Sequence, residues 1–254
     1  MNELNEYKKF CTVLAQASAD VIKKYFRTDI SVESKKDDSP VTIADKKAEG
    51  VMRELIMKHF PNDGIVGEEY GNINEDAEYT WILDPIDGTK SFICGAFSFG
   101  TLIGLLKNGE PTIGVYNHPI LNDFLIGDNQ ETRINGEKTF VRNCGELNQA
   151  VLLTTDHLNI EKFQDIKKFD MLIKKVKLYR NWGDCYGYYL LATGYADIMI
   201  DPIMSPWDLL PLIPIIKGAG GVITDYQGND PVKGKSAIAS SPDIHSEIIS
   251  VLNN

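Results

Sequence analysis

Two acidic residues, Asp84 and Asp87, lie three positions apart in the segment Asp84-Pro85-Ile86-Asp87-Gly88-Thr89, directly after the apolar run 80–83. The run predicts a buried strand, so both carboxylates are expected at its carboxyl end, within reach of one site. Like charges this close are tolerated mainly when a cation lies between them, and carboxylate oxygens favour Mg²⁺ or Mn²⁺. A plain turn is the alternative, because Asp, Pro and Gly are common turn residues, and the spacing also occurs in calcium-binding loops.

The same segment has the features of a phosphate-binding turn. Gly88 allows the backbone to approach a ligand closely, so the amides of Gly88 and Thr89 are predicted to face a phosphate oxygen. Two further acids fit this chemistry: Glu68 ends a strand-to-turn passage, and Asp208 stands at a predicted helix start. An aspartate in that position is often only a cap, so the prediction of a site depends on all these acids together.

Composition limits the partners that the protein can have. The chain has 254 residues, a formal charge of −10 and a pI near 4.9, so its overall field repels nucleic acid and anionic membranes. A phosphate ligand therefore needs a local positive centre, which a metal ion could supply. The four cysteines form no zinc-binding pattern, and no run approaches the roughly 18 apolar residues of a membrane span or the pattern of a signal peptide. We expect a cytoplasmic protein with reduced thiols and no nucleic-acid or membrane partner.

Hydrophobic periodicity predicts the elements that carry these residues. Apolar residues at helical spacing predict a first helix within residues 4–25 and a second one over 44–60, with His59 at the edge of the core. Extended segments are expected at 102–106, 113–116, 124–126, 151–155, 196–200 and 222–224, and further helices at 185–192 and 209–219. Pro214 removes a hydrogen bond to the carbonyl of Leu210, at about 3 kcal/mol in a helix interior, so we expect a kink there.

This order of elements suggests two halves. Residues 1–145 are predicted to form an α+β half with most of the metal ligands, and residues 146–254 an α/β half that contributes Asp208 and the substrate-selecting residues.

Three separated segments resemble the signatures of the inositol monophosphatase family: Gly67-Glu68-Glu69, residues 81–89, and Trp207-Asp208 followed by Gly218-Ala219-Gly220-Gly221. Their order and spacing also fit, and the similarity extends over the whole chain. The resemblance implies a layered αβαβα sandwich with the site between the two halves, a homodimer and sensitivity to lithium.

The resemblance also implies roles for individual residues. Two or three Mg²⁺ ions are expected on Glu68, Asp84, Asp87, Asp208 and the carbonyl of Ile86. Asp45 is expected to pair with Thr89, so that Thr89 and Glu68 orient the attacking water, with Asp87, Gly88 and Thr89 at the phosphate. Metal ions make such a water acidic, and Asp45 with Thr89 can accept its proton.

Substrate choice is expected to depend on the run 180–188, which is more similar to the histidinol-phosphatase branch of the family. Asp184 and Asp201 could receive the amine or imidazole of histidinol phosphate. Arg180, Gly183 and Cys185 belong to the same candidate set. In the alternative interpretation Asp184 bonds to nearby backbone, Asp201 only ends a strand and Arg180 anchors the loop.

The resulting prediction is a Mg²⁺-dependent phosphatase of histidine biosynthesis that hydrolyses L-histidinol phosphate. Inositol 1-phosphate and fructose 1,6-bisphosphate are the alternative substrates, and a non-catalytic metal-binding regulatory protein is the alternative from another class. Tyr186, Tyr188 and Tyr189 are predicted to pack in the core and at its margin. The charged segment 35–38 is predicted to be a solvated, mobile loop that approaches the metals in relatives.

Overall fold

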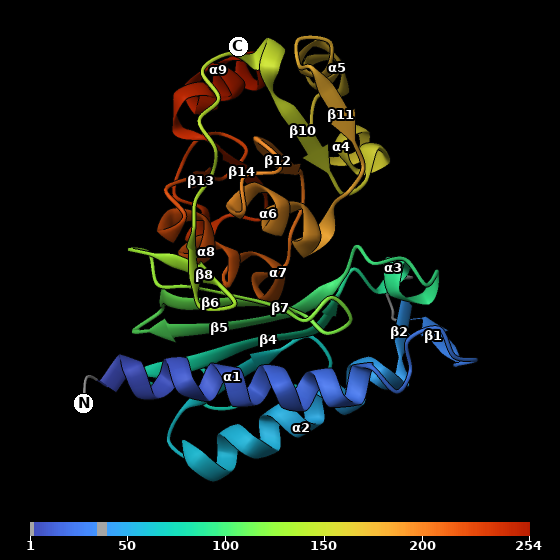
Figure 1. Cartoon of the computed structure of the whole chain (residues 1–254), viewed down its shortest axis with the longest axis vertical. Helices are drawn as coiled ribbons and strands as arrows, with labels where there is room; N and C mark the ends of the chain where they lie inside the picture. Colours follow the sequence, from blue (N-terminus) through green and yellow to red (C-terminus); the bar gives the residue numbers. More distant parts are fainter. Residues whose placement is uncertain (1–2, 35–39) are drawn as a thin grey trace.

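The computed structural model describes residues 3–34 and 40–254, and its elements alternate between helical and sheet layers (Figure 1). Helices α1 (Glu3–Ile22) and α2 (Ile43–His59) cover one face of a large sheet. The middle layer consists of α6 (Asp184–Ala192), α7 (Pro206–Leu209) and α8 (Leu212–Gly218). The outer layer beyond the second sheet consists of α4 (His157–Phe163), α5 (Ile166–Ile173) and α9 (Pro242–Asn253). The predicted αβαβα sandwich is confirmed.

The larger sheet has seven strands in chain order. They are β3 (Gly64–Gly67), β4 (Tyr79–Asp87), β5 (Gly100–Lys107), β6 (Glu110–His118), β7 (Asp123–Gly127), β8 (Thr132–Ile134) and β9 (Glu137–Thr139). β3 and β4 are parallel, whereas each later strand is antiparallel to its neighbour. Parallel pairing brings the carboxyl ends of β3 and β4 to the same edge. A short antiparallel pair, β1 (Val32–Ser34) and β2 (Pro40–Thr42), precedes α2, and α3 (Thr89–Ile93) follows β4.

The smaller sheet has five strands in the order β11-β10-β12-β14-β13. Their bounds are β10 (Val151–Thr154), β11 (Leu178–Arg180), β12 (Ile198–Asp201), β13 (Val222–Thr224) and β14 (Ala237–Ser240), with short 3-10 turns at η1 (Leu147–Gln149) and η2 (Pro231–Lys233). β10 and β12 are parallel, so Thr155 and Asp201 come to the same edge of this sheet.

Strand alternation distributes the core between the layers. On β12, Ile198 packs with the outer helices and Met199 packs with the middle layer. On β4, Trp81 and Leu83 pack against α1 and α2, whereas Ile82 faces the middle layer. The same alternation continues into the acidic segment and points Asp84 toward the middle layer.

The predicted helix over 209–219 is wrong in one respect, because the chain forms two helices, α7 and α8, with a break at Leu210 and Pro211. The interruption that we expected at Pro214 therefore lies earlier in the chain, at Leu210 and Pro211. Leu210 is the residue whose carbonyl Pro214 cannot serve, because proline has no N–H to donate. The break allows α7 to place Asp208 independently of α8.

Smaller expectations have mixed outcomes. α1 ends at Ile22, so Tyr25 lies beyond the helix. His59 is exposed, and its ring lies 5.1 Å from that of Phe10. Tyr188 is fully buried in the core, as predicted. The segment 35–38 lies outside the described residues.

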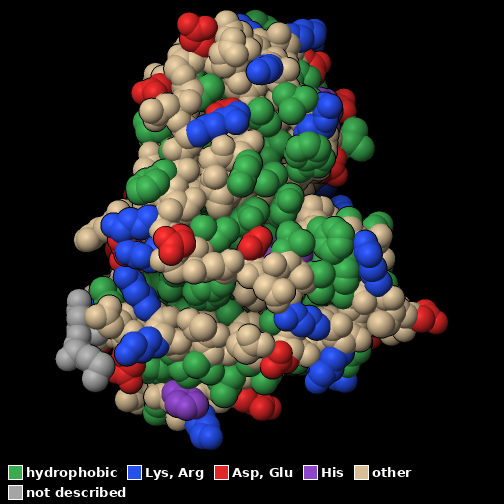
Figure 2. All heavy atoms as spheres, in the orientation of Figure 1, with side chains coloured by type: hydrophobic (Ala, Val, Ile, Leu, Met, Phe, Trp, Pro, Cys, Tyr) green, Lys and Arg blue, Asp and Glu red, His purple; other side chains and the backbone are tan. Residues whose placement is uncertain are grey.

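On the face of the molecule that Figure 2 presents, the charged side chains are spread over the surface. Figure 2 shows acidic and basic side chains interspersed with apolar ones on the face that it presents. Among the described residues, no helix combines the length and apolar character needed to cross a membrane.

Candidate active site

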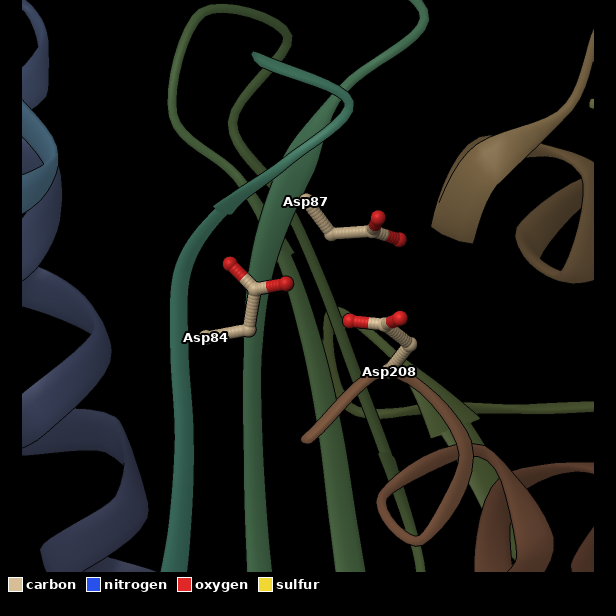
Figure 3. A group of neighbouring side chains, drawn as sticks. All are labelled: Asp84, Asp87 and Asp208. Carbon is tan, nitrogen blue, oxygen red and sulfur yellow. The ribbon is translucent and has the colours of Figure 1, made fainter. Parts of the chain in front are cut away.

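Three aspartates converge where β4 meets the middle layer. Asp84 and Asp87 come from β4 and Asp208 from α7, and each offers a carboxylate oxygen within 4.8 Å of the others (Figure 3). The β4–β5 ladder shifts register between Asp84 and Asp87, which lets two residues of odd spacing turn toward one side. Two predicted ligands from one strand and one from a distant helix are thus brought together.

The environment of Asp84 is one that a bound cation could stabilise. Asp84 is only 2% exposed, and its Oδ1 atom has no hydrogen-bond partner among the described residues. Burial raises the pKa of Asp84, and the nearby charges of Glu68, Asp87 and Asp208 raise it further. A buried, repelled carboxylate with an unpartnered oxygen is costly unless it is protonated or bound to a cation. Oxygen donors of this kind suit Mg²⁺ or Mn²⁺.

Asp208 combines the two roles that the sequence left open. Its Oδ2 accepts a hydrogen bond of 3.0 Å from the amide of Ser205, which makes it part of a capping box at the start of α7. The same carboxyl is one of the three clustered aspartates, and burial raises its pKa to about 7. Capping therefore orients Asp208 without removing it from the cluster.

Glu68 follows β3 at the edge that β3 shares with β4. Its amide donates a hydrogen bond of 3.1 Å to the carbonyl of Leu83, next to Asp84. The charge of Glu68 raises the pKa of both Asp84 and Asp208, so the carboxylate lies close to the cluster.

Thr89 connects the cluster to Asp45. Its hydroxyl donates to the carbonyl of Ile86 at 3.0 Å and, more weakly, to Oδ1 of Asp45 at 3.4 Å. The other carboxylate oxygen of Asp45 accepts from the amide and the hydroxyl of Thr42, at 2.9 and 2.6 Å, so Asp45 also caps α2. The expected pairing of Asp45 with Thr89 is present, although the long distance makes it a loose one.

Glycine at position 88 is required by the local backbone. Its φ is +89°, and a Cβ atom there would lie 2.7 Å from the carbonyl oxygen of Ser98. Any other residue would be strained at this φ and would clash.

A cavity of about 350 Å³ opens beside the cluster. Its lining includes the predicted residues Glu68, Asp87, Gly88, Thr89, Gly183, Asp184, Asp201 and Asp208. Among the described lining residues, Lys90 is the one basic side chain, and all the other charged side chains are acids. A phosphate bound in this cavity would therefore need a local positive centre.

Thr155 holds both proposed substrate-selecting acids. Its hydroxyl accepts a hydrogen bond of 2.8 Å from the amide of Asp184, and its own amide donates to Oδ1 of Asp201 at 3.3 Å. Gly183 is needed for this contact, since a Cβ atom on it would lie 2.1 Å from Cα of Thr155. The hydroxyl of Tyr188 donates to the second oxygen of Asp201 at 3.0 Å.

Asp184 and Asp201 differ in how their carboxylates are used. Asp201 ends β12, as the alternative interpretation held, and burial raises its pKa to about 6. Asp184 uses its amide for Thr155, whereas its carboxylate accepts no hydrogen bond from the described residues and faces Gly88, with Oδ2 3.1 Å from the Cβ position there. Burial, and then the charges of Asp201 and Asp208, raise the pKa of Asp184 to about 7.

Two of the predicted substrate-selecting residues, Arg180 and Cys185, are not among the described residues that line the cavity. Arg180 is exposed, donates to the carbonyl of Tyr179 at 2.7 Å and is absent from the described lining residues. Cys185 is fully buried; its amide donates to Oδ2 of Asp87 at 2.5 Å. Cys185 therefore orients Asp87, and burial raises the pKa of its thiol, which keeps it protonated.

Sequence reasoning missed Thr155 and Ser205, which bind site residues, and Glu49, whose carboxylate accepts hydrogen bonds from the amides of Glu69 and Tyr70 next to Glu68. Thr155 is the last residue of a predicted extended segment and directly follows β10, so the rule that ligands gather at the carboxyl ends of strands could have found it. Ser205 is three positions before Asp208, which is the spacing of a capping box. Glu49 is an acid on the inward face of a predicted amphipathic helix with Arg53 one turn later, which is a signal of a buried ion pair.

Comparisons with known proteins agree with this geometry. A model of the inositol monophosphatase family matches residues 3–254. The chain is 45% identical over 245 residues to "Bifunctional phosphatase IMPL2, chloroplastic" of Arabidopsis thaliana, covering 94% of this chain and 70% of the relative. It is 35% identical over 244 residues to a histidinol-phosphatase of Chlorobaculum parvum, covering 95% and 94%. A solved inositol monophosphatase from Zymomonas mobilis superposes with a TM-score of 0.89 at 35% identity, covering 100% of both chains.

Fold, site and relatives together define a phosphoric monoester hydrolase. The chain belongs to the inositol monophosphatase family, which is metal-dependent, and the clustered aspartates are a place where a metal could bind. The regulatory, non-catalytic alternative is set aside, because the relatives are named phosphatases.

Proposed function

We propose that this protein is a Mg²⁺-dependent phosphatase that hydrolyses L-histidinol phosphate to L-histidinol and phosphate. The observation that carries the proposal is the carboxylate of Asp184, which lies beside the Gly88 turn and accepts no hydrogen bond from the described residues. A substrate whose phosphate occupies that turn would bring its amine or imidazole within reach of this acid. Inositol phosphate offers hydroxyl groups there and no positive charge.

The proposed metal ligands are Glu68, Asp84, Asp87, Asp208 and the carbonyl of Ile86. This set of oxygen donors is suited to two or three Mg²⁺ ions, and Mn²⁺ could replace them. When bound, the ions would activate water and offset negative charge on the phosphate. The unpartnered oxygen of Asp84 is the structural feature that supports ligation.

The chain's own residues would then divide the remaining work. Thr89 and Asp45 would orient the attacking water and accept its proton, and Glu68 would help to hold it. The amides of Gly88 and Thr89 would bind phosphate oxygens at the start of α3. Asp184 and Asp201 would receive the cationic or donor groups of the alcohol. The oxygen of the water would bond to phosphorus, and the proton taken from that water would be delivered to the leaving oxygen, so that the alcohol and phosphate are released.

Inositol 1-phosphate is the second candidate, because the solved relative at 35% identity is named an inositol monophosphatase and the histidinol-phosphatase relative has the same identity. Overall identity therefore does not separate the two substrates. Fructose 1,6-bisphosphate is a further alternative. Homodimer formation, lithium inhibition and a cytoplasmic location stay predictions that follow from the family resemblance.

A charge-removing variant of Asp184 tests the proposal. Asp184 has a φ of +51°, which asparagine tolerates and a β-branched threonine does not, so Asp184→Asn changes the charge without straining the backbone. We expect kcat/KM for histidinol phosphate to fall about 10- to 100-fold, the equivalent of about 1.5–3 kcal/mol for a hydrogen bond to a charged group. The rate with inositol 1-phosphate should change by less than about threefold.

The wild-type rates decide between the substrates. Hydrolysis of inositol 1-phosphate faster than that of histidinol phosphate would contradict the assignment, as would equal losses for both substrates in Asp184→Asn. Asn159, another residue of the cavity lining, offers a control through Asn159→Ala, which alters the wall without changing its charge.

A further inference from the structure

Another fully buried acid, Glu49 of α2, lies outside the group of three clustered aspartates. It is 0% exposed, and its carboxylate accepts three hydrogen bonds from the described residues. Its Oε1 accepts from Nη1 of Arg53 at 2.9 Å and from the amide of Tyr70 at 3.2 Å. Its Oε2 accepts from the amide of Glu69 at 2.8 Å. One side chain of the helix layer therefore binds two successive amides of the turn that carries Glu68.

The surrounding chain is shaped for this contact. A Cβ atom on Gly67 would lie 2.2 Å from Oε1 of Glu49, so the carboxylate can reach the turn only because residue 67 is glycine. Arg53, which is 6% exposed, completes the contact by donating through Nη2 to the carbonyl of Gly71. The pair therefore holds the turn at its amides and at its far carbonyl.

We call Glu49 and Arg53, with their contacts to the turn 67–71, the clamp. The clamp bears on the reaction because Glu68 lies within this turn. Glu68 lies between Gly67, which β3 holds, and Glu69, whose amide Glu49 holds. Its own amide bonds to Leu83 on β4. The backbone on both sides of Glu68 is therefore held, and the carboxylate of Glu68 is close enough to Asp84 for its charge to raise the pKa of Asp84. A buried ion pair adds little net stability by itself, because desolvation offsets much of the attraction, whereas its geometric effect on attached backbone is large.

We propose that Glu49 and Arg53 are positioning residues. They hold the turn 67–71 and thereby orient the carboxylate of Glu68 so that it can bind a metal ion and the attacking water. The inference rests on the proposed function, in which Glu68 is a metal ligand. It predicts that the clamp changes metal affinity and turnover by more than its contribution to stability explains.

The test compares Glu49→Gln with a matched control in the other half of the molecule. Asp197 is also 0% exposed, pairs with Arg142 and accepts from the amide of Val151 at 2.7 Å, and it is not among the described residues that line the cavity. Asp197→Asn therefore removes the same kind of buried charge without touching the turn. Both variants should lower the thermal unfolding midpoint of the full chain.

Calorimetric titration with Mg²⁺, without substrate, separates them. We expect Glu49→Gln to raise the Mg²⁺ dissociation constant about tenfold or more and to lower kcat at saturating Mg²⁺, with Asp197→Asn staying within about twofold of the wild type. Equal Mg²⁺ affinity in the two variants would overturn the inference. A wild type that binds no Mg²⁺ would instead refute the proposed metal site, and the inference with it.

Arg53→Lys covers the case in which Glu49→Gln does not fold. Lysine keeps the charge near Glu49, but a single ammonium cannot match the forked contact to both the carboxylate and the carbonyl of Gly71. We expect a severalfold weaker Mg²⁺ affinity with a small change in the unfolding midpoint. Wild-type affinity in Arg53→Lys would contradict the clamp.

Discussion

Asp84 and Asp201 are two buried acids near the carboxyl ends of central strands, one in each sheet, with 2% and 5% of their surfaces exposed. Both oxygens of Asp201 accept hydrogen bonds, from the amide of Thr155 and the hydroxyl of Tyr188. Asp84 instead keeps an unpartnered oxygen and has other acids as its nearest charges.

Burial alone therefore does not make an acid a metal ligand. The protein satisfies Asp201 from its own donors, so this acid can shape the cavity without any ion. Asp84 has no such donors at Oδ1, so a cation is what would relieve its repulsion and its loss of hydration. We call these the satisfied acid and the repelled acid.

The largest expected effect comes from neutralising the repelled acid. Asp84→Asn should reduce phosphate release by more than about 100-fold, because a proposed ligand of the metal is weakened. The same variant should raise the unfolding midpoint of the metal-free protein, since it removes one of several like charges. Roughly 1 kcal/mol would give about 2–4 °C in a chain of this size.

Asp201→Asn is expected to shift the unfolding midpoint of the metal-free protein in the opposite direction. It should lower the metal-free midpoint, because asparagine's amide nitrogen cannot accept one of the two hydrogen bonds. Differential scanning calorimetry in EDTA measures both variants. Equal shifts of the same sign for Asp84→Asn and Asp201→Asn would show that the two acids do not differ as described.

A smaller effect is expected from the residue that holds the substrate-facing acids. Thr155→Val removes the hydroxyl that accepts from the amide of Asp184 and keeps the side-chain shape. A lost hydrogen bond of about 1 kcal/mol should raise KM for histidinol phosphate about fivefold, with kcat changed less. Thr154→Val is the control, since its hydroxyl donates to the carbonyl of Ile200 at 2.7 Å. A similar KM change in both variants would exclude a positioning role for Thr155.

The smallest expected effect is on the pH dependence of stability. The pKa of Asp184 is raised from 3.8 to about 7, so the folded chain binds this proton more tightly than the unfolded chain does. Its contribution to the free energy of unfolding is therefore largest below the unfolded pKa and is lost as the pH rises toward about 7. The midpoint of the metal-free wild type should fall relative to that of Asp184→Asn across this window.

His245 acts in the other direction, because burial lowers its pKa to about 4, and its contribution is lost as the pH falls below its ordinary value of 6.5. That effect is common to wild type and Asp184→Asn, so the difference between their melting curves isolates Asp184. Parallel curves from about pH 4 to 7 would contradict the raised pKa.

The sequence by itself determined the acids and the elements that carry them. A run of apolar residues before Asp84 was enough to predict β4, and the spacing of Gly67-Glu68 and Trp207-Asp208 was enough to suggest the family and its αβαβα layers. These features depend on neighbours along the chain, where strand alternation, turn residues and capping act over a few positions. The same local logic placed the interruption near Pro214.

Only the tertiary structure decided which side chains meet. It brought Asp208 of α7 to β4, put Thr155 between Asp184 and Asp201, and set Glu49 against the turn after Gly67. It also placed Arg180 on the surface, although its position in the sequence lies close to Asp184. Such contacts depend on how whole layers pack and on which hydrogen-bond donors reach a buried acid, and residues far apart in the chain supply both.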